Sequence, residues 1–349
     1  MRTRQIIARA VVATLTALAA ATQVHAEDFD RLRGVVAPVK AKKPYRIGWA
    51  AIHFVDTFWV STAYGLVDEA KQAGVDLVRI LPAGGYGNLA EQQAALEQLA
   101  ALNLDAILIS GVTYQGFDRA VKRLTDRGIK VAVLGTPVDA KTVSFGVVED
   151  QKDDGVRAGQ YLCSQEKNAK VVAIPGPAGA EWNKIRFEGF KAEAEKCGTQ
   201  VLGATYEGGM GLEDGRKQAE DLMVKYPDAH YIWTVAGNIG DGAAEAIKRS
   251  GRKDIWVIGS GFTANTAEMM KEGYIKMYLS EPAILSGRLA VQYVTRLLNG
   301  DELPNLVPNL VPYPGVVIPT PPVEAKNINS YNLEQYDQAP AGWNVPLTK

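Results

Sequence analysis

The sequence predicts an α/β protein built from two doubly wound parallel-sheet lobes, with a hinge and a ligand cleft between them. Three observations predict this fold. Short apolar runs suited to buried strands alternate with segments of helical periodicity, and glycines punctuate the short links. The alternation runs through residue 148 and then restarts. The chain has 349 residues, which fits two lobes of about 150 residues each.

The elements of the first set follow from apolar runs and from the glycines that end helices. Gly74 and Gly128 each follow a segment of helical periodicity, as expected for a left-handed helix terminus. The run Ala106-Ile107-Leu108-Ile109-Ser110 is typical of a strand that is buried on both faces. We expect strands at 46–51, 76–81, 106–110, 131–134 and 144–148, and helices at 59–73, 89–102 and 117–127.

The second set repeats this alternation. We expect strands at 170–174, 200–206, 231–235, 255–259 and 274–279. The helices are expected at 154–164, 185–196, 213–225, 240–249 and 284–298, with one further short helix around 269–271. When helices connect parallel strands, the helices cover both faces of the sheet. The carboxyl ends of the strands then lie at one edge of the sheet, where ligands bind.

The segment from Asn305 onward has a different composition. Seven prolines between residues 304 and 322 predict extended, poorly helical chain. Three aromatic residues follow, at Tyr331, Tyr336 and Trp343. They indicate a tail that packs on the surface.

Composition excludes several classes of protein. The 38 Lys and Arg residues nearly balance 39 Asp and Glu residues, giving a formal net charge of −1. The chain therefore lacks the basic excess of a nucleic-acid binder and the charge imbalance of a disordered protein. Two cysteines are too few for a disulfide framework or a four-ligand zinc site.

The first 26 residues have the organisation of a cleavable export signal. Arg2, Arg4 and Arg9 precede an apolar stretch at 10–21, and a small-residue cleavage site ends at Ala26. The apolar stretch is shorter than the roughly 20 residues that span a bilayer. We expect cleavage after Ala26 and export of the mature protein to the periplasm.

The two cysteines, Cys163 and Cys197, both follow the export signal. An oxidising compartment permits a disulfide between them. The alternative is a pair of buried thiols, because the sequence gives no distance. The export signal favours the bridge.

A series of short motifs resembles the type I periplasmic binding proteins. Asp56-Thr57-Phe58-Trp59, with Gly65 six residues further on, is similar to the opening motif N-P-F-[FW]-x5-G of that family. Further motifs follow in the family's order: Leu104-Asp105-Ala106-Ile107-Leu108, Glu149-Asp150 with Gly155, Arg186-Phe187-Glu188-Gly189-Phe190, and Glu281-Pro282 with Gly287. The resemblance covers nearly the whole chain after residue 26 and implies a two-lobed receptor that closes on a small solute.

Within this family, several blocks resemble the branch that binds trimethylamine N-oxide and works with a membrane histidine kinase. They are Asp56-Thr57-Phe58-Trp59-Val60-Ser61 with Tyr64-Gly65, Ala83-Gly84-Gly85-Tyr86, and Pro175-Gly176-Pro177 leading to Glu188-Gly189-Phe190. This resemblance implies an aromatic box whose first members are Phe58, Trp59 and Tyr86. Sugar-binding relatives place acids near Gly135, Gly237 and Gly261, and their absence here argues against a typical pentose or hexose.

The family resemblance leads us to assign four parts. They are a signal peptide at 1–26, an N-terminal lobe at 27–148 plus 262–281, a C-terminal lobe at 149–261 plus 282–320, and a surface-packed tail at 321–349.

Aromatic residues form the first group of ligand candidates. Phe58 and Trp59 follow a strand at its carboxyl end, and Tyr86 lies in a glycine-rich loop. An aromatic face attracts a cation or a polarised methyl group by about 0.5–2 kcal/mol. The alternative for each is core packing. Trp182 and Phe262 are weaker candidates of the same kind.

Polar residues form the second group. Asp56, Glu149 and Asp150 contact the ligand or cap the helices that follow them. Arg186 clamps a carboxylate or an N-oxide oxygen, or is a solvated helix charge. Asn238 and Glu281 are further cleft candidates.

Catalysis has little support in this sequence. After residue 26 the histidines are His53 and His230, far apart on unrelated elements, and no G-x-S-x-G, H-E-x-x-H or P-loop motif occurs. We therefore expect a binding protein without catalytic residues, cofactor or metal.

The predicted function is a periplasmic receptor for a small polar ligand, with an amine, an N-oxide or a zwitterion favoured over a sugar. The alternative is the substrate-binding subunit of an ABC importer for another small solute, including a sugar. The membrane partner is accordingly an ABC permease or the periplasmic domain of a histidine kinase. The sequence marks no long apolar seam, so we expect a monomer when the partner is absent.

Overall fold

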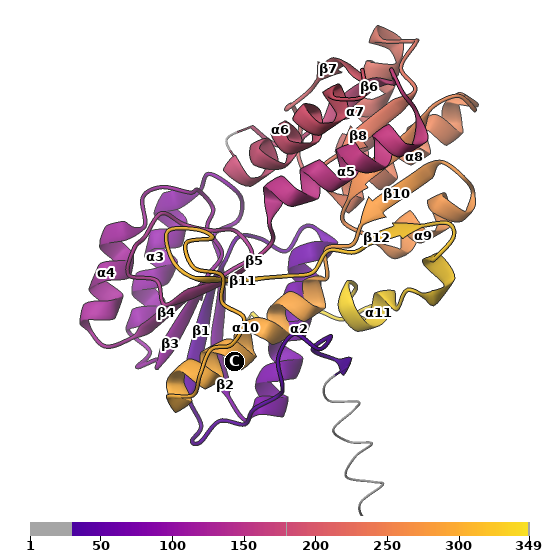
Figure 1. Cartoon of the computed structure of the whole chain (residues 1–349). Helices are drawn as coiled ribbons and strands as arrows, with labels where there is room; N and C mark the ends of the chain where they lie inside the picture. The colour runs from indigo at the N-terminus through magenta and orange to yellow at the C-terminus, as the bar shows by residue number, and fades with distance from the viewer. Residues whose placement is uncertain (1–29, 179, 348–349) are drawn as a thin grey trace, which may run out of the picture.

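The computed structural model describes residues 30–178 and 180–347, and in this part of the chain two α/β lobes lie side by side (Figure 1). Each lobe is built on a six-stranded sheet. The strand orders are β11-β5-β4-β3-β1-β2 and β12-β10-β9-β8-β6-β7. The two doubly wound lobes predicted from the alternation of strands and helices are confirmed. The proposed signal peptide at 1–26 lies outside the described residues.

The N-terminal lobe surrounds a sheet of buried apolar strands. Every residue of β3 is buried, as the run Ala106–Ile109 predicts. Helices α2 and α10 pack against each other, and α3 and α4 lie on the other side of the sheet (Figure 1). The elements of this lobe are β1 Arg46–Ala51, α2 Thr57–Ala73, β2 Asp76–Pro82, α3 Leu89–Ala100, β3 Ala106–Ile109, α4 Asp118–Asp126, β4 Lys130–Leu134, β5 Phe145–Val148, α10 Ala283–Asn299 and β11 Gly315–Val317.

The C-terminal lobe repeats this plan. Helix α5 packs on α6, and α7 packs on α8. Cys163 of α5 and Cys197 just after α6 are joined by a disulfide, with 5.6 Å between their Cα atoms. The elements are α5 Gln151–Gln165, β6 Lys170–Ile174, α6 Glu181–Glu195, β7 Gln200–Ala204, α7 Leu212–Lys225, β8 Tyr231–Thr234, α8 Gly237–Ser250, β9 Trp256–Ser260, α9 Ala264–Lys271, β10 Ile275–Leu279 and β12 Pro322–Glu324.

Glycines set how closely the helices that flank the cleft approach each other. A methyl group on Gly65 of α2 would lie 2.0 Å from the carbonyl oxygen of Ile284 in α10. A methyl group on Gly155 of α5 would lie 2.0 Å from the carbonyl oxygen of Arg186 in α6. Only glycine permits these approaches. The glycines of the family motifs therefore fix the helix pairs from which cleft residues project.

The lobe boundaries expected from sequence are wrong for two segments. Residues 262–281 were assigned to the N-terminal lobe, but β10 pairs in parallel with β9 of the other sheet. Residues 282–320 were assigned to the C-terminal lobe, but α10 packs on α2 and β11 pairs with β5. The chain therefore crosses between lobes after β5, after β10 and after β11. A crossover at residues 318–321 was not expected, since prolines hide the short strands on either side of it.

The tail, expected to pack on the surface, is part of the framework. Strand β12 pairs antiparallel with β10. A single 3-10 turn at Ile328–Ser330 and the short helix α11 at Leu333–Tyr336 follow, and α11 packs on α10. The Tyr336 hydroxyl donates to the Asp30 carbonyl at 3.0 Å. The tail thus runs back across both lobes near the cleft.

No helix among residues 30–178 and 180–347 is long and apolar enough to cross a membrane.

Candidate ligand-binding site

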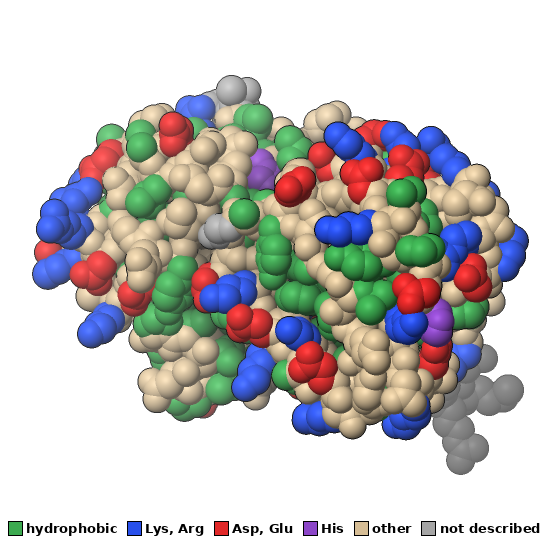
Figure 2. All heavy atoms as spheres, turned by 90° about the horizontal axis from the view of Figure 1, so that it is seen from above, with side chains coloured by type: hydrophobic (Ala, Val, Ile, Leu, Met, Phe, Trp, Pro, Cys, Tyr) green, Lys and Arg blue, Asp and Glu red, His purple; other side chains and the backbone are tan. Residues whose placement is uncertain are grey.

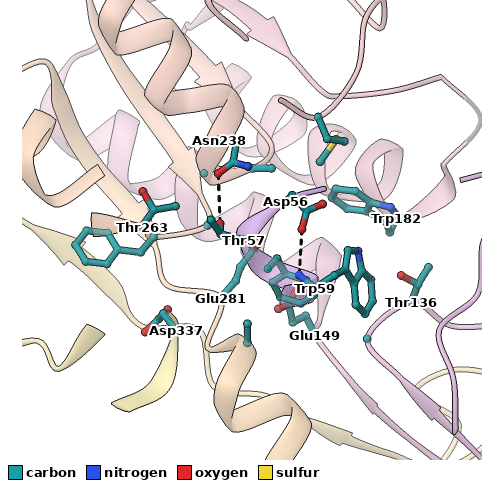
Figure 3. A pocket seen from close by; sticks show the side chains of 18 of the residues that line it. Asp56, Thr57, Trp59, Thr136, Glu149, Trp182, Asn238, Thr263, Glu281 and Asp337 are labelled. Carbon is teal, nitrogen blue, oxygen red and sulfur yellow. Dashed lines mark hydrogen bonds between the residues drawn. The ribbon is translucent and has the colours of Figure 1, made fainter. Parts of the chain in front are cut away.

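A partly open cavity of about 80 Å³ lies between the two lobes (Figure 3). Every residue proposed from sequence as a ligand contact lines it except Asp150. The lining residues are Asp56, Thr57, Phe58, Trp59, Tyr86, Gly135, Thr136, Glu149, Gln151, Trp182, Arg186, Met210, Ala236, Gly237, Asn238, Gly261, Phe262, Thr263, Glu281, Ala283, Asp337 and Gln338. The cavity thus gathers loops from the carboxyl ends of strands in both lobes, where doubly wound folds bind ligands.

Aromatic rings form the wall on the N-terminal lobe. The ring of Phe58 meets Trp59 edge to face, with 5.0 Å between centroids. Trp59 also packs on Trp49 of β1 and lies over Gly135, where a methyl group would be 2.8 Å from the indole. Trp59 is therefore both a core residue and a wall residue. Phe58 is partly exposed toward the cavity.

Contacts between the lobes show that the cleft is closed. The Tyr86 ring of the N-terminal lobe lies 6.2 Å from the Trp182 ring of α6. The Thr57 hydroxyl donates to Asn238 Oδ1 of α8 at 3.3 Å (Figure 3). Both contacts join a residue of one lobe to a residue of the other lobe. The cavity in this conformation is the space that a bound solute would occupy.

Arg186 is the centre of a buried charge cluster on the C-terminal lobe. Its guanidinium donates to Glu149 Oε2 at 2.9 Å and to Glu281, and it lies 3.7 Å from Asp154 Oδ2. The remaining donors meet Gln151 Oε1 at 2.7 Å and the Val235 carbonyl at 3.0 Å. Glu149 and Glu281 lie on two of the crossover segments. The guanidinium is thus held by protein acceptors in this conformation, and the expected clamp on a ligand carboxylate stays a prediction.

Three acids, Glu149, Asp154 and Glu281, surround the single guanidinium of Arg186. Burial raises the pKa of Glu149, and the charge of Glu281 raises it further against the effect of Arg186. Burial also raises the pKa of Glu281, with Arg186 acting in the opposite direction. Glu149 Oε1 is buried and has no hydrogen-bond partner, although the side chain is only 6% exposed. One oxygen of a residue that lines the cavity is therefore unpaired, which is costly unless a ligand donates to it.

Asp56 has both of the roles considered for it. Its Oδ1 accepts the Trp59 amide at 3.0 Å and so caps α2, while the residue lines the cavity. Its other oxygen lies 3.6 Å from His53 Nε2. Burial raises the pKa of Asp56, opposed by His53 and by the amides of Trp59 and Phe58. Asp150, by contrast, caps α5 through the Asp153 amide at 3.0 Å and does not line the cavity. The cavity lining therefore gives no support to its proposed ligand contact.

The tail adds two lining residues that the sequence did not indicate, Asp337 and Gln338. Asp337 is 5% exposed and accepts the Ser280 hydroxyl at 2.6 Å and the Tyr331 hydroxyl. Burial raises its pKa to about 7, against the effect of these two donors. No motif marks this residue, because its place in the cavity depends on how the tail folds back. Asp337 lies on the C-terminal segment, near Thr263 (Figure 3).

Thr57, Thr136, Gln151, Met210 and Thr263 also line the cavity and were missed. Each of them lies within a few residues of a predicted strand end, which is the signal that would have included them. Across residues 30–178 and 180–347, no group of three or more His, Cys, Asp or Glu side chains is placed to hold a metal ion.

A cavity between two doubly wound lobes that are joined by three crossovers defines the two-lobed solute-receptor class. Residues 47–302 match the family described as "Periplasmic binding protein domain", and the chain belongs to this family, with the type I fold.

Curated relatives of this chain include a periplasmic protein and a ribose import binding protein. It is 29% identical over 271 residues to the periplasmic protein TorT of Escherichia coli strain K12, a match that covers 76% of each chain. It is 25% identical over 263 residues to the ribose import binding protein RbsB of Bacillus subtilis strain 168, covering 75% of this chain and 84% of that protein.

A similar solved structure has more than 30% identity to this chain. It is the substrate-binding protein of a sugar ABC transport system from Bordetella parapertussis 12822. The two are 36% identical with a TM-score of 0.86, over 90% of this chain and 100% of that one. A solute-binding protein from Bradyrhizobium sp. BTAi1, 23% identical with a TM-score of 0.76 over 90% of this chain and 92% of that one, shares the fold.

Proposed function

We propose that this protein is a periplasmic receptor that closes on a small amine or methylated ammonium compound, an N-oxide included. The observation that carries the proposal is that one cavity is lined both by aromatic rings and by more acidic side chains than basic ones. Asp56, Glu149, Glu281 and Asp337 line the cavity, whereas Arg186 is the lining residue with a permanent positive charge. Export and cleavage after Ala26 are part of this proposal.

The aromatic wall suits a cation in a desolvated space. Phe58, Trp59, Tyr86 and Trp182 present rings to the cavity from both lobes. A cation over such a ring gains about 0.5 kcal/mol at exposed sites and about 2 kcal/mol when it is desolvated. Methyl groups on nitrogen carry part of the positive charge and also bury apolar surface, so a methylated ammonium uses both properties of the wall.

The carboxylates supply the selectivity for positive charge. Arg186 already donates to Glu149 and Glu281, so one guanidinium is shared by two acids. A ligand N–H directed at Glu149 Oε1 would satisfy the unpaired oxygen there. Because the Arg186 donors are occupied, a ligand carboxylate would have to displace a protein acid. This favours an amine over a zwitterion.

The acidity is a property of the cavity rather than of the whole surface. On the face shown in Figure 2, Lys and Arg side chains are interspersed with Asp and Glu side chains over both lobes. The formal net charge is only −1. A cationic solute is therefore selected inside the cleft and not by a general attraction to the protein.

A sugar is the second candidate, since the Bordetella parapertussis relative carries a sugar-transport description. Carboxylates such as Asp56 and Glu149 can accept hydroxyl groups, and Trp59 can stack on a sugar ring. A sugar does not account for the gathering of four acids around one Arg in the cavity, because a sugar has no positively charged group to pair with them.

The downstream partner follows from neither the cavity nor the fold. Import through an ABC permease and reporting to a histidine kinase both use ligand-driven closure. Genes adjacent to the coding sequence discriminate: permease and ATPase genes indicate import, and kinase and response-regulator genes indicate sensing.

The test is a thermal-shift screen of the mature protein, followed by calorimetry. The panel contains trimethylamine N-oxide, choline, betaine, polyamines, amino acids and sugars. A ligand at 100 times its dissociation constant adds about 2.7 kcal/mol of stability. We expect upward shifts with choline-like or amine compounds and none with sugars. A response to sugars alone would overturn the proposal and leave the receptor class intact.

A further inference from the structure

The C-terminal segment at 331–343 touches both lobes at the mouth of the cleft. The Ala339 amide donates to Ser61 Oγ of α2 at 2.9 Å, and Gln338 Oε1 accepts the Ala264 amide at the start of α9 at 2.7 Å. Trp343 meets Tyr64 of α2 edge to face at 5.4 Å. One short stretch of chain is therefore bonded to elements of both sheets, and its contacts depend on how the lobes are placed.

Asp337 lies within this segment and is hydrogen-bonded to the crossover that follows β10. Ser280, on the crossover after β10, donates to Asp337 Oδ1 at 2.6 Å. The Tyr331 hydroxyl donates to Oδ2, and the Tyr331 ring meets Phe262 edge to face at 5.5 Å. Each carboxylate oxygen has two acceptor sites. One acceptor site on each oxygen therefore remains for a group in the cavity.

The charges around Asp337 leave room for one more cation. Glu149 and Glu281 line the same cavity as Asp337. The charge of Glu149 raises the pKa of Asp337, and the charge of Asp337 raises the pKa of Glu281. The positive charge of Arg33 lowers the pKa of Asp337 against the effect of burial. Its guanidinium lies over the Tyr336 ring, 4.8 Å from the centroid. Arg186 is occupied by Glu149 and Glu281. The unpartnered Glu149 Oε1 is a second and independent sign that the space between these acids is built for a donor.

We propose that the segment at 331–343 is a third wall of the ligand site, and that Asp337 is the carboxylate through which this wall selects a positively charged solute. The inference rests on the proposed function. A protonated amine or methylated ammonium would lie between the aromatic rings of the two lobes and the carboxylates of Glu149 and Asp337. Because the segment is bonded to both lobes, it docks fully only when they close, so ligand capture and docking of the tail are coupled.

The test compares the full-length mature protein with the variants Asp337→Asn and Glu334→Gln. Glu334 is exposed on the short helix that ends just before Asp337 and does not line the cavity, so it serves as the matched control. The probes are choline, putrescine and trimethylamine N-oxide, with 3,3-dimethylbutan-1-ol as the neutral carbon analogue of choline. Calorimetry gives the dissociation constants.

We expect Asp337→Asn to weaken cation binding by about tenfold or more and to narrow the preference for choline over its neutral analogue. Glu334→Gln should stay within about twofold of the unmodified protein. If the unmodified protein binds choline but both variants bind it equally well, this inference is overturned and the proposed function stands. If the unmodified protein binds no cationic probe, the proposed function fails first.

Amide hydrogen exchange on the unmodified protein gives a second readout that needs no variant. We expect the amides of 331–343 to exchange more slowly when choline is bound, since docking orders the segment across both lobes. Unchanged exchange in this segment at saturating choline would overturn the coupling even if Asp337→Asn failed to fold.

Discussion

At the residue scale, Arg186 is the group on which the buried charges of the cleft depend. Burial works against its positive charge, but Glu281, Asp154 and Glu149 more than offset this and raise its pKa. Replacing one partner of a buried ion pair leaves the other charges uncompensated and costs about 3–5 kcal/mol. We expect Arg186→Met to lose stability of that order at neutral pH, measured by urea denaturation.

A matched control for this prediction is Arg216→Met. Arg216 also contacts two carboxylates, Glu213 at 2.7 Å and Glu220 at 2.6 Å, but on the solvent-exposed side of α7. Exposed ion pairs contribute little. Mild acid should partly restore Arg186→Met, because Glu149 and Glu281 then take up protons. Equal losses in the two variants, with no effect of acid, would contradict the role given to Arg186.

The carboxylate of Asp337 also gives a pH dependence with a definite sign. Its pKa is raised by burial from 3.8 to about 7, so between these values the folded protein binds a proton that the unfolded chain has released. The contribution of Asp337 to stability is therefore greatest below pH 3.8 and falls as pH rises to about 7. A positively charged ligand gains affinity as pH rises through about 7, because the carboxylate of the folded protein becomes ionised there.

This dependence is measured by calorimetric melting of unliganded protein and Asp337→Asn across that interval. The nearby charged groups, Arg33, Glu149 and Glu281, are common to both proteins, so the difference between the two curves isolates Asp337. We expect the unmodified protein to lose stability relative to the variant as pH rises. Parallel curves would show that Asp337 does not titrate in this range.

At the scale of elements, the contact between α2 and α10 depends on glycine. A methyl group at Gly65 would overlap the Ile284 carbonyl oxygen, which belongs to backbone and cannot rotate away. Overpacking of this kind costs about 1–3 kcal/mol or more, since the helices must separate. We expect Gly65→Ala to lower the free energy of unfolding by this amount, although alanine is the better helix former.

The control on the same helix is Lys71→Ala, at an exposed position of α2. Surface changes of this kind stay within about 0.5 kcal/mol. Because α10 carries the crossover residues Glu281 and Pro282 at its start, Gly65→Ala should also weaken ligand binding. A variant as stable as the control would mean that the two helices are not packed as closely as described.

The regular elements were predictable because buried strands and amphipathic helices leave a period in the sequence. The expected ranges agree with the observed strands and long helices to within a few residues, as for β1 at Arg46–Ala51 and α10 at Ala283–Asn299. Strands β11 and β12 were not predicted. Each has three residues among prolines, and neither shows a period of its own. Their pairing is decided by neighbours distant in the chain, and so the lobe boundaries after residue 261 were also missed.

At the scale of the whole molecule, the site was predictable only where one element carries it. Phe58, Trp59 and Tyr86 follow strand ends and were found for that reason. Arg186 was found as a cleft residue. Its partners Glu149 and Glu281 lie 37 and 95 residues away in the sequence, so the ion pairs that occupy its guanidinium could not be predicted. Asp337 enters the cavity from a tail that touches both lobes. Residues brought together by the meeting of lobes, crossovers and tail leave no local pattern.

Closure of the two lobes is the property on which every proposed role of the cleft rests. Tyr86 and Trp182 touch across it, as do Thr57 and Asn238. A ligand can shift the protein to this form only by the difference in its affinity for the closed and open forms. A cation that touches walls from both lobes and the tail has a large difference, because in an open form it would keep only one wall.

We therefore expect saturating choline to compact the protein, measured as a fall in the radius of gyration by small-angle X-ray scattering. Trp182→Ala removes the ring that Tyr86 meets, so this variant should need more ligand to reach the same compaction. Val224→Ala, at an exposed position of α7 far from the cavity lining, should behave as the unmodified protein does. Identical scattering with and without bound ligand would mean that the lobes are already closed in the free protein. Selection would then depend on how solutes enter a preformed cavity rather than on closure.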